Sequence, residues 1–139
     1  MVYDMNLAEQ VRAAKRVYIV GNGGSYANAQ HICNDLLSCG VRVYTIDSAT
    51  LSAFANDYGW DVALSRWISV VGEDGDLLIA LSGSGKSRNI LNAIDEAMGI
   101  GMTVHRIFGS TRGETMQEAE EMQLTIGHQL RACLQQPTS

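Results

Sequence analysis

The stretch that decides the fold is V-Y-I-V-G-N-G-G-S, residues 17–25. Four apolar residues of strand type run directly into a glycine-rich turn, and the residues that follow have helical spacing. Glycines in such a turn let the backbone approach a ligand closely, and the first turn of a helix offers unpaired N–H groups to an anion. The stretch therefore predicts a strand, a ligand-binding loop and a helix in direct succession.

The same alternation continues along the chain. Short apolar runs predict strands at 17–20, 41–46, 76–82 and 102–109. Helical spacing predicts helices at 6–15, from a cap at Ser25 to Gly40, at about 54–70, from Ser87 onward and at about 115–134. In the helix that follows Ser87, the residues expected to face inward are Ile90, Leu91, Ile94 and Met98. The nearly continuous apolar character of the strands is typical of parallel strands that are covered on both faces. We therefore expect an α/β fold, with a doubly wound parallel sheet in a single domain, 1–139.

Composition excludes several classes of protein. The net charge is −5, and the ten Lys and Arg residues are scattered along the chain, which argues against nucleic acid as a partner. No apolar stretch approaches the length that spans a bilayer, so we expect a soluble, cytoplasmic protein without a membrane partner. The cysteines Cys33, Cys39 and Cys133 are odd in number and lack C-x-x-C spacing, which predicts buried free thiols.

A second glycine-rich loop, S-G-S-G-K-S at 82–87, follows the third predicted strand. Its hydroxyls, its backbone amides and the Lys86 ammonium can converge on one phosphate. A single loop of this kind often serves only to reverse the chain, but two loops after parallel strands favour a ligand. Neither loop has the spacing of a dinucleotide-binding or Walker A motif. The sequence therefore predicts a phosphorylated ligand smaller than a nucleotide.

Polar residues also occur on the far sides of two predicted helices. His31 and Asp35 are four residues apart, so they share one helix face, and that face is turned away from the sheet. The last helix carries Glu120, Gln123 and His128 among apolar neighbours. These residues either form ordinary solvated faces or meet a partner subunit.

Four segments together resemble the SIS domain (sugar isomerase fold), and in particular the phosphoheptose isomerases, which act on sedoheptulose 7-phosphate. They are G-N-G-G-S-Y-A-N-A-Q-H at 21–31, L-S-A-F-A-N-D-Y-G at 51–59, G-D-L-L-I-A-L-S-G-S-G-K-S at 75–87 and G-M-T-V at 101–104. The resemblance implies a flavodoxin-like parallel sheet. Here the first helix is shorter than is usual in similar enzymes, and the segment between Gly109 and Glu120 is too short for the usual fifth strand. We therefore expect four to five strands.

The resemblance also implies which residues bind the phosphosugar. Gly83 and Lys86 stand where similar enzymes more often have Thr and Asn, which shifts the expected phosphate contacts toward the lysine. The implied binding residues are Asn22, Gly23, Gly24, Ser25, Asn56, Asp57, Ser82, Gly83, Ser84, Lys86, Ser87 and Glu120.

Similar enzymes hold a metal, usually zinc, with a His and a Glu on the first of these helices and a Gln and a His on the last. By resemblance, His31 and His128 are two ligands, Asp35 replaces the Glu, and Glu120 replaces the Gln. On one helix, Glu120 and His128 are separated by roughly 12 Å, so sharing an ion requires long side chains, a bend near Gly127 or a second subunit.

The implied activity is aldose–ketose isomerisation through an enediol. Asp35 and His128 are the expected catalytic residues that exchange protons, while a divalent metal, expected to be zinc, polarises the sugar oxygens. Similar enzymes share their sites between subunits, so we expect a homo-oligomer, a dimer or a tetramer. The alternative is a non-catalytic SIS module, either a sugar-phosphate sensor or a protein that binds a replication initiator. Retention of His31, Asp35 and His128 favours the enzyme.

Overall fold

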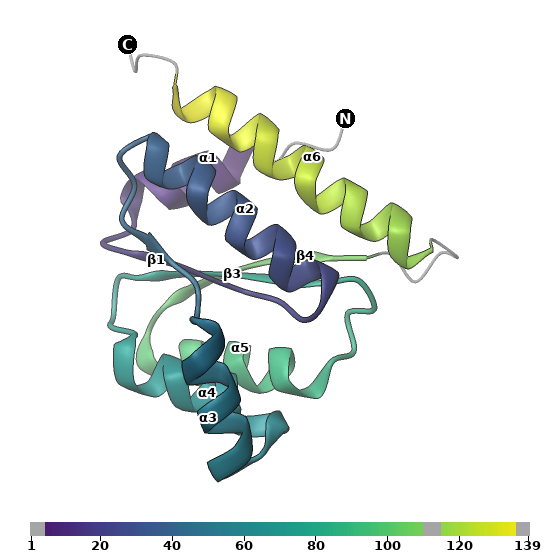
Figure 1. Cartoon of the computed structure of the whole chain (residues 1–139). Helices are drawn as coiled ribbons and strands as arrows, with labels where there is room; N and C mark the ends of the chain where they lie inside the picture. The colour runs from purple at the N-terminus through teal and green to yellow at the C-terminus, as the bar shows by residue number, and fades with distance from the viewer. Residues whose placement is uncertain (1–4, 110–114, 136–139) are drawn as a thin grey trace.

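A computed structural model describes residues 5–109 and 115–135 of the chain. Four parallel strands form one sheet between two layers of helices (Figure 1), as expected for a doubly wound α/β domain. The strands are β1 (Val17–Val20), β2 (Val43–Tyr44), β3 (Leu77–Ser82) and β4 (Thr103–Phe108), in the order β2-β1-β3-β4. The helices are α1 (Met5–Ala13), α2 (Gly24–Ser38), α3 (Ser48–Tyr58), α4 (Trp60–Val71), α5 (Arg88–Ile100) and α6 (Met116–Leu134).

The two central strands, β1 and β3, are buried along their whole length. Because successive side chains in a strand point to opposite faces, each central strand contributes to two separate cores. Ile19 and Ile79 face the layer of α1, α2 and α6, whereas Tyr18 and Leu78 face the layer of α4 and α5 (Figure 1). The predicted apolar runs therefore form a sheet that is covered on both faces.

The helix predicted at about 54–70 is two helices, α3 and α4, so that prediction was wrong. The break falls at Gly59, whose φ of 98° and ψ of 151° lie in a region that only glycine enters easily. In the resulting hairpin, α3 contains no buried residue. The strand predicted at 41–46 is likewise shorter, since only Val43 and Tyr44 pair with β1.

Two other local expectations also require correction. Helix α2 begins at Gly24 with Gly23 as its N-cap, so Ser25 is not a cap and instead lies buried in the first turn. Leu91 and Met98 of α5 are 37% and 58% exposed, because the stripe that contacts the sheet runs through smaller neighbours such as Ala93 and Ala97. The same prediction is confirmed for Ile90 and Ile94, which are buried, and was wrong only for Leu91 and Met98.

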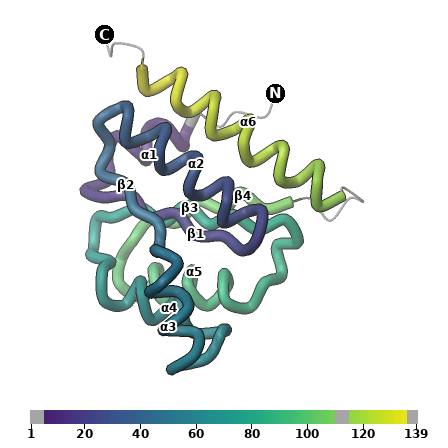
Figure 2. Tube along the Cα trace, in the orientation of Figure 1, coloured from purple at the N-terminus to yellow at the C-terminus, as the bar shows by residue number. Residues whose placement is uncertain are grey.

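Helix α6 starts where the sequence predicts it, with a reciprocal capping box. The Thr115 hydroxyl accepts a hydrogen bond from the Glu118 backbone N–H at 3.1 Å, and the Glu118 carboxylate accepts one from the Thr115 N–H at 3.2 Å. From there α6 runs beside α2 above the sheet, as the trace in Figure 2 shows.

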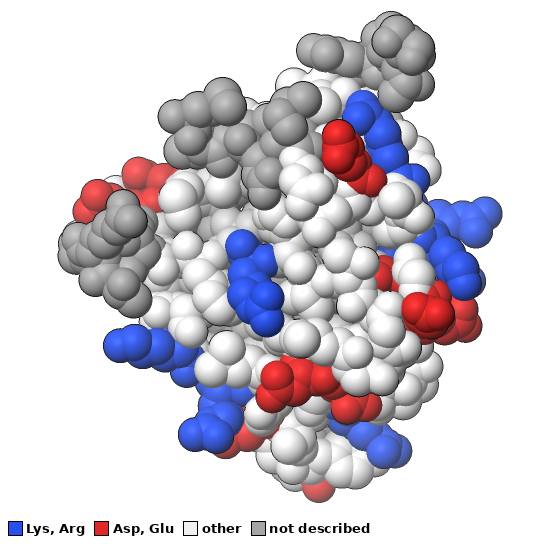
Figure 3. Space-filling view, turned by 180° about the vertical axis from the view of Figure 1, so that it is seen from behind, with Lys and Arg blue, Asp and Glu red and all other residues white. Residues whose placement is uncertain are grey.

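The surface shows no gathering of one charge on the face opposite to Figure 1. Lys and Arg side chains are interspersed with Asp and Glu across that face (Figure 3). Among the helices in the described ranges, none has a stretch both long and apolar enough to cross a bilayer.

Candidate active site

The two glycine-rich loops lie side by side because β1 and β3 are neighbouring parallel strands. Val20 pairs with Ala80, so both strands end at the same edge of the sheet. The side-chain amides of Asn22 and Asn89 form a reciprocal pair, each donating to the oxygen of the other at 2.8 Å. This pair joins the loop after β1 to the first turn of α5.

A small pocket of about 40 Å³ opens between these loops. Its outer wall is Met116 of α6, which packs on Gly83: a Cβ at that glycine would stand 2.6 Å from the Met116 Cε. Six of the residues expected to bind the phosphosugar line the pocket together. They are Asn22, Ser25, Ser82, Gly83, Ser84 and Ser87.

Three of the four serine hydroxyls that line the pocket accept a hydrogen bond from another group of the chain. Ser25 Oγ accepts a hydrogen bond from Gln123 Nε2 at 3.0 Å, and Ser82 Oγ accepts one from the Gly85 N–H at 2.9 Å. Ser84 Oγ accepts one from the Lys86 N–H at 3.1 Å. Within the described part of the chain, none of these hydroxyl protons has an acceptor, so each is available to an anion.

A second cluster lies between α2 and α6. His31 Nε2 is 3.3 Å from His128 Nε2 and 3.4 Å from Asp35 Oδ2, and all three potential ligand atoms lie within 4.8 Å of one another. The histidines are exposed, but the Asp35 side chain is only 5% exposed. Helix α6 covers it, so the interpretation of His31 and Asp35 as a solvated surface pair was wrong for Asp35.

The two oxygens of Asp35 have different surroundings. Oδ1 lies 3.1 Å from Nη1 of Arg131, whereas Oδ2 is buried and has no hydrogen-bond partner among residues 5–109 and 115–135. A buried carboxylate oxygen without a partner is costly unless a cation or donor approaches it. Together with the two imidazole nitrogens, this oxygen forms a donor set that suits a divalent metal such as zinc.

Glu120 lies outside that group of three. Its carboxylate lies against Gly24, where a Cβ would meet Glu120 Oε2 at 1.7 Å, so a side chain at that position would displace the carboxylate. Its expected role as a metal ligand stays a prediction.

Three of the other expected residues lie apart from the phosphate pocket. Asn56 and Asp57 are exposed on α3, across the sheet from α2 and α6, where they hydrogen-bond to each other at 3.2 Å. Lys86 is exposed and does not line the pocket.

Several residues that organise the site were given no role in it from the sequence. Gln123 was expected on a solvated or subunit-facing side of the last helix, and that expectation was wrong. Gln123, fully buried in α6, connects Ser25 to Asn28, whose Nδ2 donates to Gln123 Oε1 at 2.8 Å. The position of this glutamine on the apolar stripe of α6 could have indicated that it is buried. For Arg131 the indication is weaker: it lies one turn after His128, and therefore on the same side of α6.

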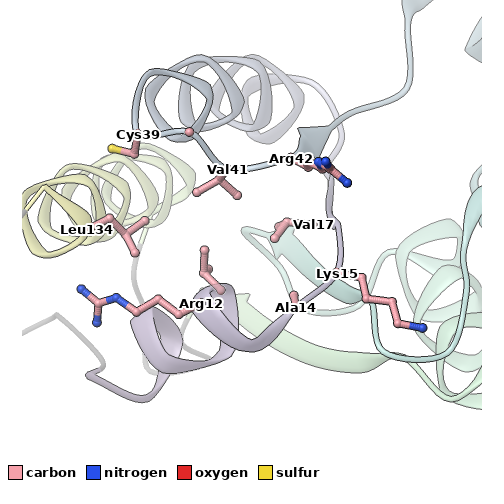
Figure 4. Close-up of a pocket in the computed structure, with 10 residues that line it drawn as sticks. Arg12, Ala14, Lys15, Val17, Cys39, Val41, Arg42 and Leu134 are labelled. Carbon is pink, nitrogen blue, oxygen red and sulfur yellow. The ribbon is translucent and has the colours of Figure 1, made fainter. Parts of the chain in front are cut away.

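A larger cavity of about 380 Å³ lies at the opposite edge of the sheet, where β1 begins (Figure 4). Its floor is apolar, with Val17, Val41 and Leu134, and Arg12 and Lys15 stand at its sides. It shares no residue with the loops or with the histidine cluster. The glycine-rich loops and the α2–α6 cluster therefore define the candidate active site.

Comparison with known proteins places this architecture in a class. The SIS domain profile matches residues 5–109, which include both loops and the α2 part of the histidine cluster. The chain is 36% identical to the phosphoheptose isomerase of Campylobacter concisus, over 94% of this chain and 72% of that protein.

Solved structures agree. A phosphoheptose isomerase from Francisella tularensis superposes with a TM-score of 0.85 and 25% identity, covering 94% of this chain and 83% of that one. Phosphoheptose isomerase GmhA from Neisseria gonorrhoeae shares the fold, with a TM-score of 0.84 at 24% identity over 92% of this chain and 80% of that one. The chain therefore belongs to the phosphoheptose isomerase family of SIS-domain proteins.

Proposed function

We propose that the protein is an aldose–ketose isomerase that converts sedoheptulose 7-phosphate into its aldose isomer. The observation that carries the proposal is that one helix joins both parts of the site. Ser25 of the phosphate pocket and His31 of the histidine cluster both lie on α2, about 9 Å apart along its axis. A sugar phosphate held by its phosphate in the loops can extend its carbon chain toward the cluster. The relatives named phosphoheptose isomerase support this substrate.

Isomerisation moves a proton between two adjacent carbons, so a base must remove it and an acid must return it. His128 is exposed at the cluster, and an imidazole is the side chain that most often carries a proton in such reactions, so His128 is suited to this role. Asp35 is the second residue that we propose takes part, by exchanging the proton of the sugar hydroxyl. The loops fix the remote phosphate, so the reacting carbons are held in one orientation.

His31, Asp35 and His128 are the residues that would hold a divalent metal, which we propose is zinc. When bound, such an ion supplies a positive charge that polarises the sugar oxygens. The orphaned Asp35 Oδ2 supports this assignment.

We further propose that the protein works as a homo-oligomer in the cytoplasm. Asn56 and Asp57 lie on α3, away from the phosphate pocket of their own chain, and α3 buries none of its residues. A second copy that packs on α3 brings both residues to a neighbouring site.

The activity is tested by following the interconversion of sedoheptulose 7-phosphate with metal supplied. His128→Ala should lower kcat by about 10²- to 10⁴-fold, the usual contribution of a general acid–base group. Calorimetry should show that the variant still binds the phosphosugar, because the loops are intact. His105→Ala is the matched control, since His105 lies in β4 and hydrogen-bonds Gln10 instead. A wild-type protein that is loaded with metal and inactive would contradict the proposal.

One observation favours the second candidate, a binding module without catalysis. Asp35 is paired with Arg131, and Glu120 lies outside the cluster, so two of the four implied metal positions depart from the pattern. Binding of the phosphosugar by the wild-type protein, without turnover, would support this alternative.

A further inference from the structure

Arg131 contacts Asp35, but the proposed function gives Arg131 no role. Arg131 lies three residues after His128 on α6, so both side chains face α2. Its Nη1 is 3.1 Å from Oδ1 of Asp35. The guanidinium stands at the rim, with its side chain 42% exposed, and the carboxylate stands inside, 5% exposed.

Because of this contact, the two oxygens of the Asp35 carboxylate have different surroundings. Oδ1 is held by Arg131, and Oδ2 points to His31 Nε2 at 3.4 Å without a hydrogen-bond partner. Rotation of the carboxylate would break the pair with Arg131. Because Asp35 is buried, water cannot readily replace that bond. The arginine thus fixes the orientation of the carboxylate, so that one oxygen faces the histidines and the other faces the guanidinium.

We propose that Arg131 is a positioning residue, which holds Asp35 so that a single oxygen, Oδ2, is presented to a divalent cation beside His31 and His128. The inference rests on the metal site of the proposed function, but it does not depend on the isomerase reaction. In this proposal Arg131 orients Asp35, whose side chain is one methylene shorter than the glutamate that similar enzymes have at this position.

Arg131 has two opposing effects on a cation, and their sizes decide the outcome. Its own charge repels the ion, but an exposed guanidinium is screened by solvent, which limits the repulsion to a factor of about five or less in affinity. Loss of the group that orients a metal ligand typically weakens affinity by about 10- to 100-fold. Orientation therefore outweighs repulsion, and removal of Arg131 should weaken metal binding.

The test measures binding of Co²⁺ and Zn²⁺ to the purified apoprotein by calorimetry, together with the visible absorption of the cobalt form. Arg131→Leu should bind both ions about 10- to 100-fold more weakly, with a changed cobalt spectrum because Asp35 is free to turn. Arg131→Lys should recover part of the affinity. Arg12→Leu is the matched control, since Arg12 Nη2 also holds α6, through the Cys133 carbonyl at 3.1 Å, but does not touch Asp35.

Two results would overturn the inference: wild-type protein that binds neither ion, or Arg131→Leu protein that binds them as tightly as wild type or more tightly with an unchanged spectrum. If the leucine variant does not fold, Arg131→Lys and Arg131→Gln are measured instead. Unchanged metal affinity and an unchanged cobalt spectrum in both variants would also overturn the inference. Wild-type protein whose cobalt affinity depends on Arg131 but which does not isomerise the sugar would contradict the proposed function alone.

Discussion

Asp35 illustrates how a side chain acquires its role from its surroundings. In the sequence it is one acid four residues after a histidine, a spacing common on solvated helices. In the folded chain α6 buries it and leaves one oxygen unpaired between two imidazoles. Burial and the missing partner, rather than the residue type, make it a candidate ligand.

Cys33 gives a test of side-chain burial. The thiol lies in the core between α2 and the sheet, and burial raises its pKa above the usual value. At pH 8 the reactive thiolate of Cys33 is therefore scarcer than that of an exposed cysteine, and reagent access is blocked as well. We expect the native protein to react with a thiol reagent at Cys39 and Cys133, and at Cys33 only after unfolding.

A count of reacting thiols before and after denaturation checks this expectation. Cys33→Ala should leave the native count unchanged and lower the denatured count by one. Rapid reaction of all three cysteines in native wild type would contradict it.

At the residue scale, the sequence predicted the loops better than the cluster. Glycine and serine have few roles after a buried strand, so the two loops were identified, and six of the predicted residues line one pocket. The pairing of Arg131 with Asp35 was not predicted, because it depends on the rotation of α6 against α2. No local pattern in either helix specifies that rotation.

Among the elements, the contact of α2 with α6 controls the site, because it joins His31 and Asp35 to His128. Gly127 allows the close approach, since a Cβ there would lie 2.7 Å from Cγ1 of Ile32. The missing side chain brings the helices close enough for the histidines to meet.

Gly127→Ala should therefore push the two helices apart. We expect the variant to lose about 1–3 kcal/mol of unfolding free energy, as overpacked cores usually do, and to bind metal more weakly. Chemical denaturation and metal calorimetry measure the two effects. Ile32→Ala makes room for the new methyl group, so the double variant should lose less stability than the sum of the single variants. Additive losses would show that Ile32 is not the obstruction.

Element types were easier to predict than element ends. The alternation of strands and helices was confirmed, and so was the start of α6. The missed break at Gly59 has a local cause: a glycine within a helical pattern is tolerated often enough that periodicity alone does not reveal a left-handed φ.

For the whole molecule, the exposed apolar residues of the α3–α4 hairpin bear on assembly. Tyr58, Trp60 and Val62 are 50%, 48% and 40% exposed where the two helices meet. Large apolar groups clustered on a surface commonly mark a protein interface.

Trp60→Glu should therefore convert the proposed homo-oligomer into smaller species, measured by light scattering, and should lower isomerase activity if Asn56 and Asp57 serve a neighbouring site. Val70→Glu places the same charge on a more exposed position of α4, at 69%, and should leave the assembly unchanged. A monomeric wild-type protein, or a Trp60→Glu protein of unchanged mass, would contradict this interface.

The strand order also determines when the chain can fold during synthesis. β1 lies between β2 and β3, and Val17 pairs with Leu77, 60 residues later in the chain. At about 5–20 residues per second, the ribosome takes roughly 3 to 12 seconds to deliver that partner. Until then the apolar edge of β1 has no neighbour on that side. The emerging chain therefore spends this interval open to chaperones and to other nascent chains, and its yield in the cell should depend on translation speed between the two central strands.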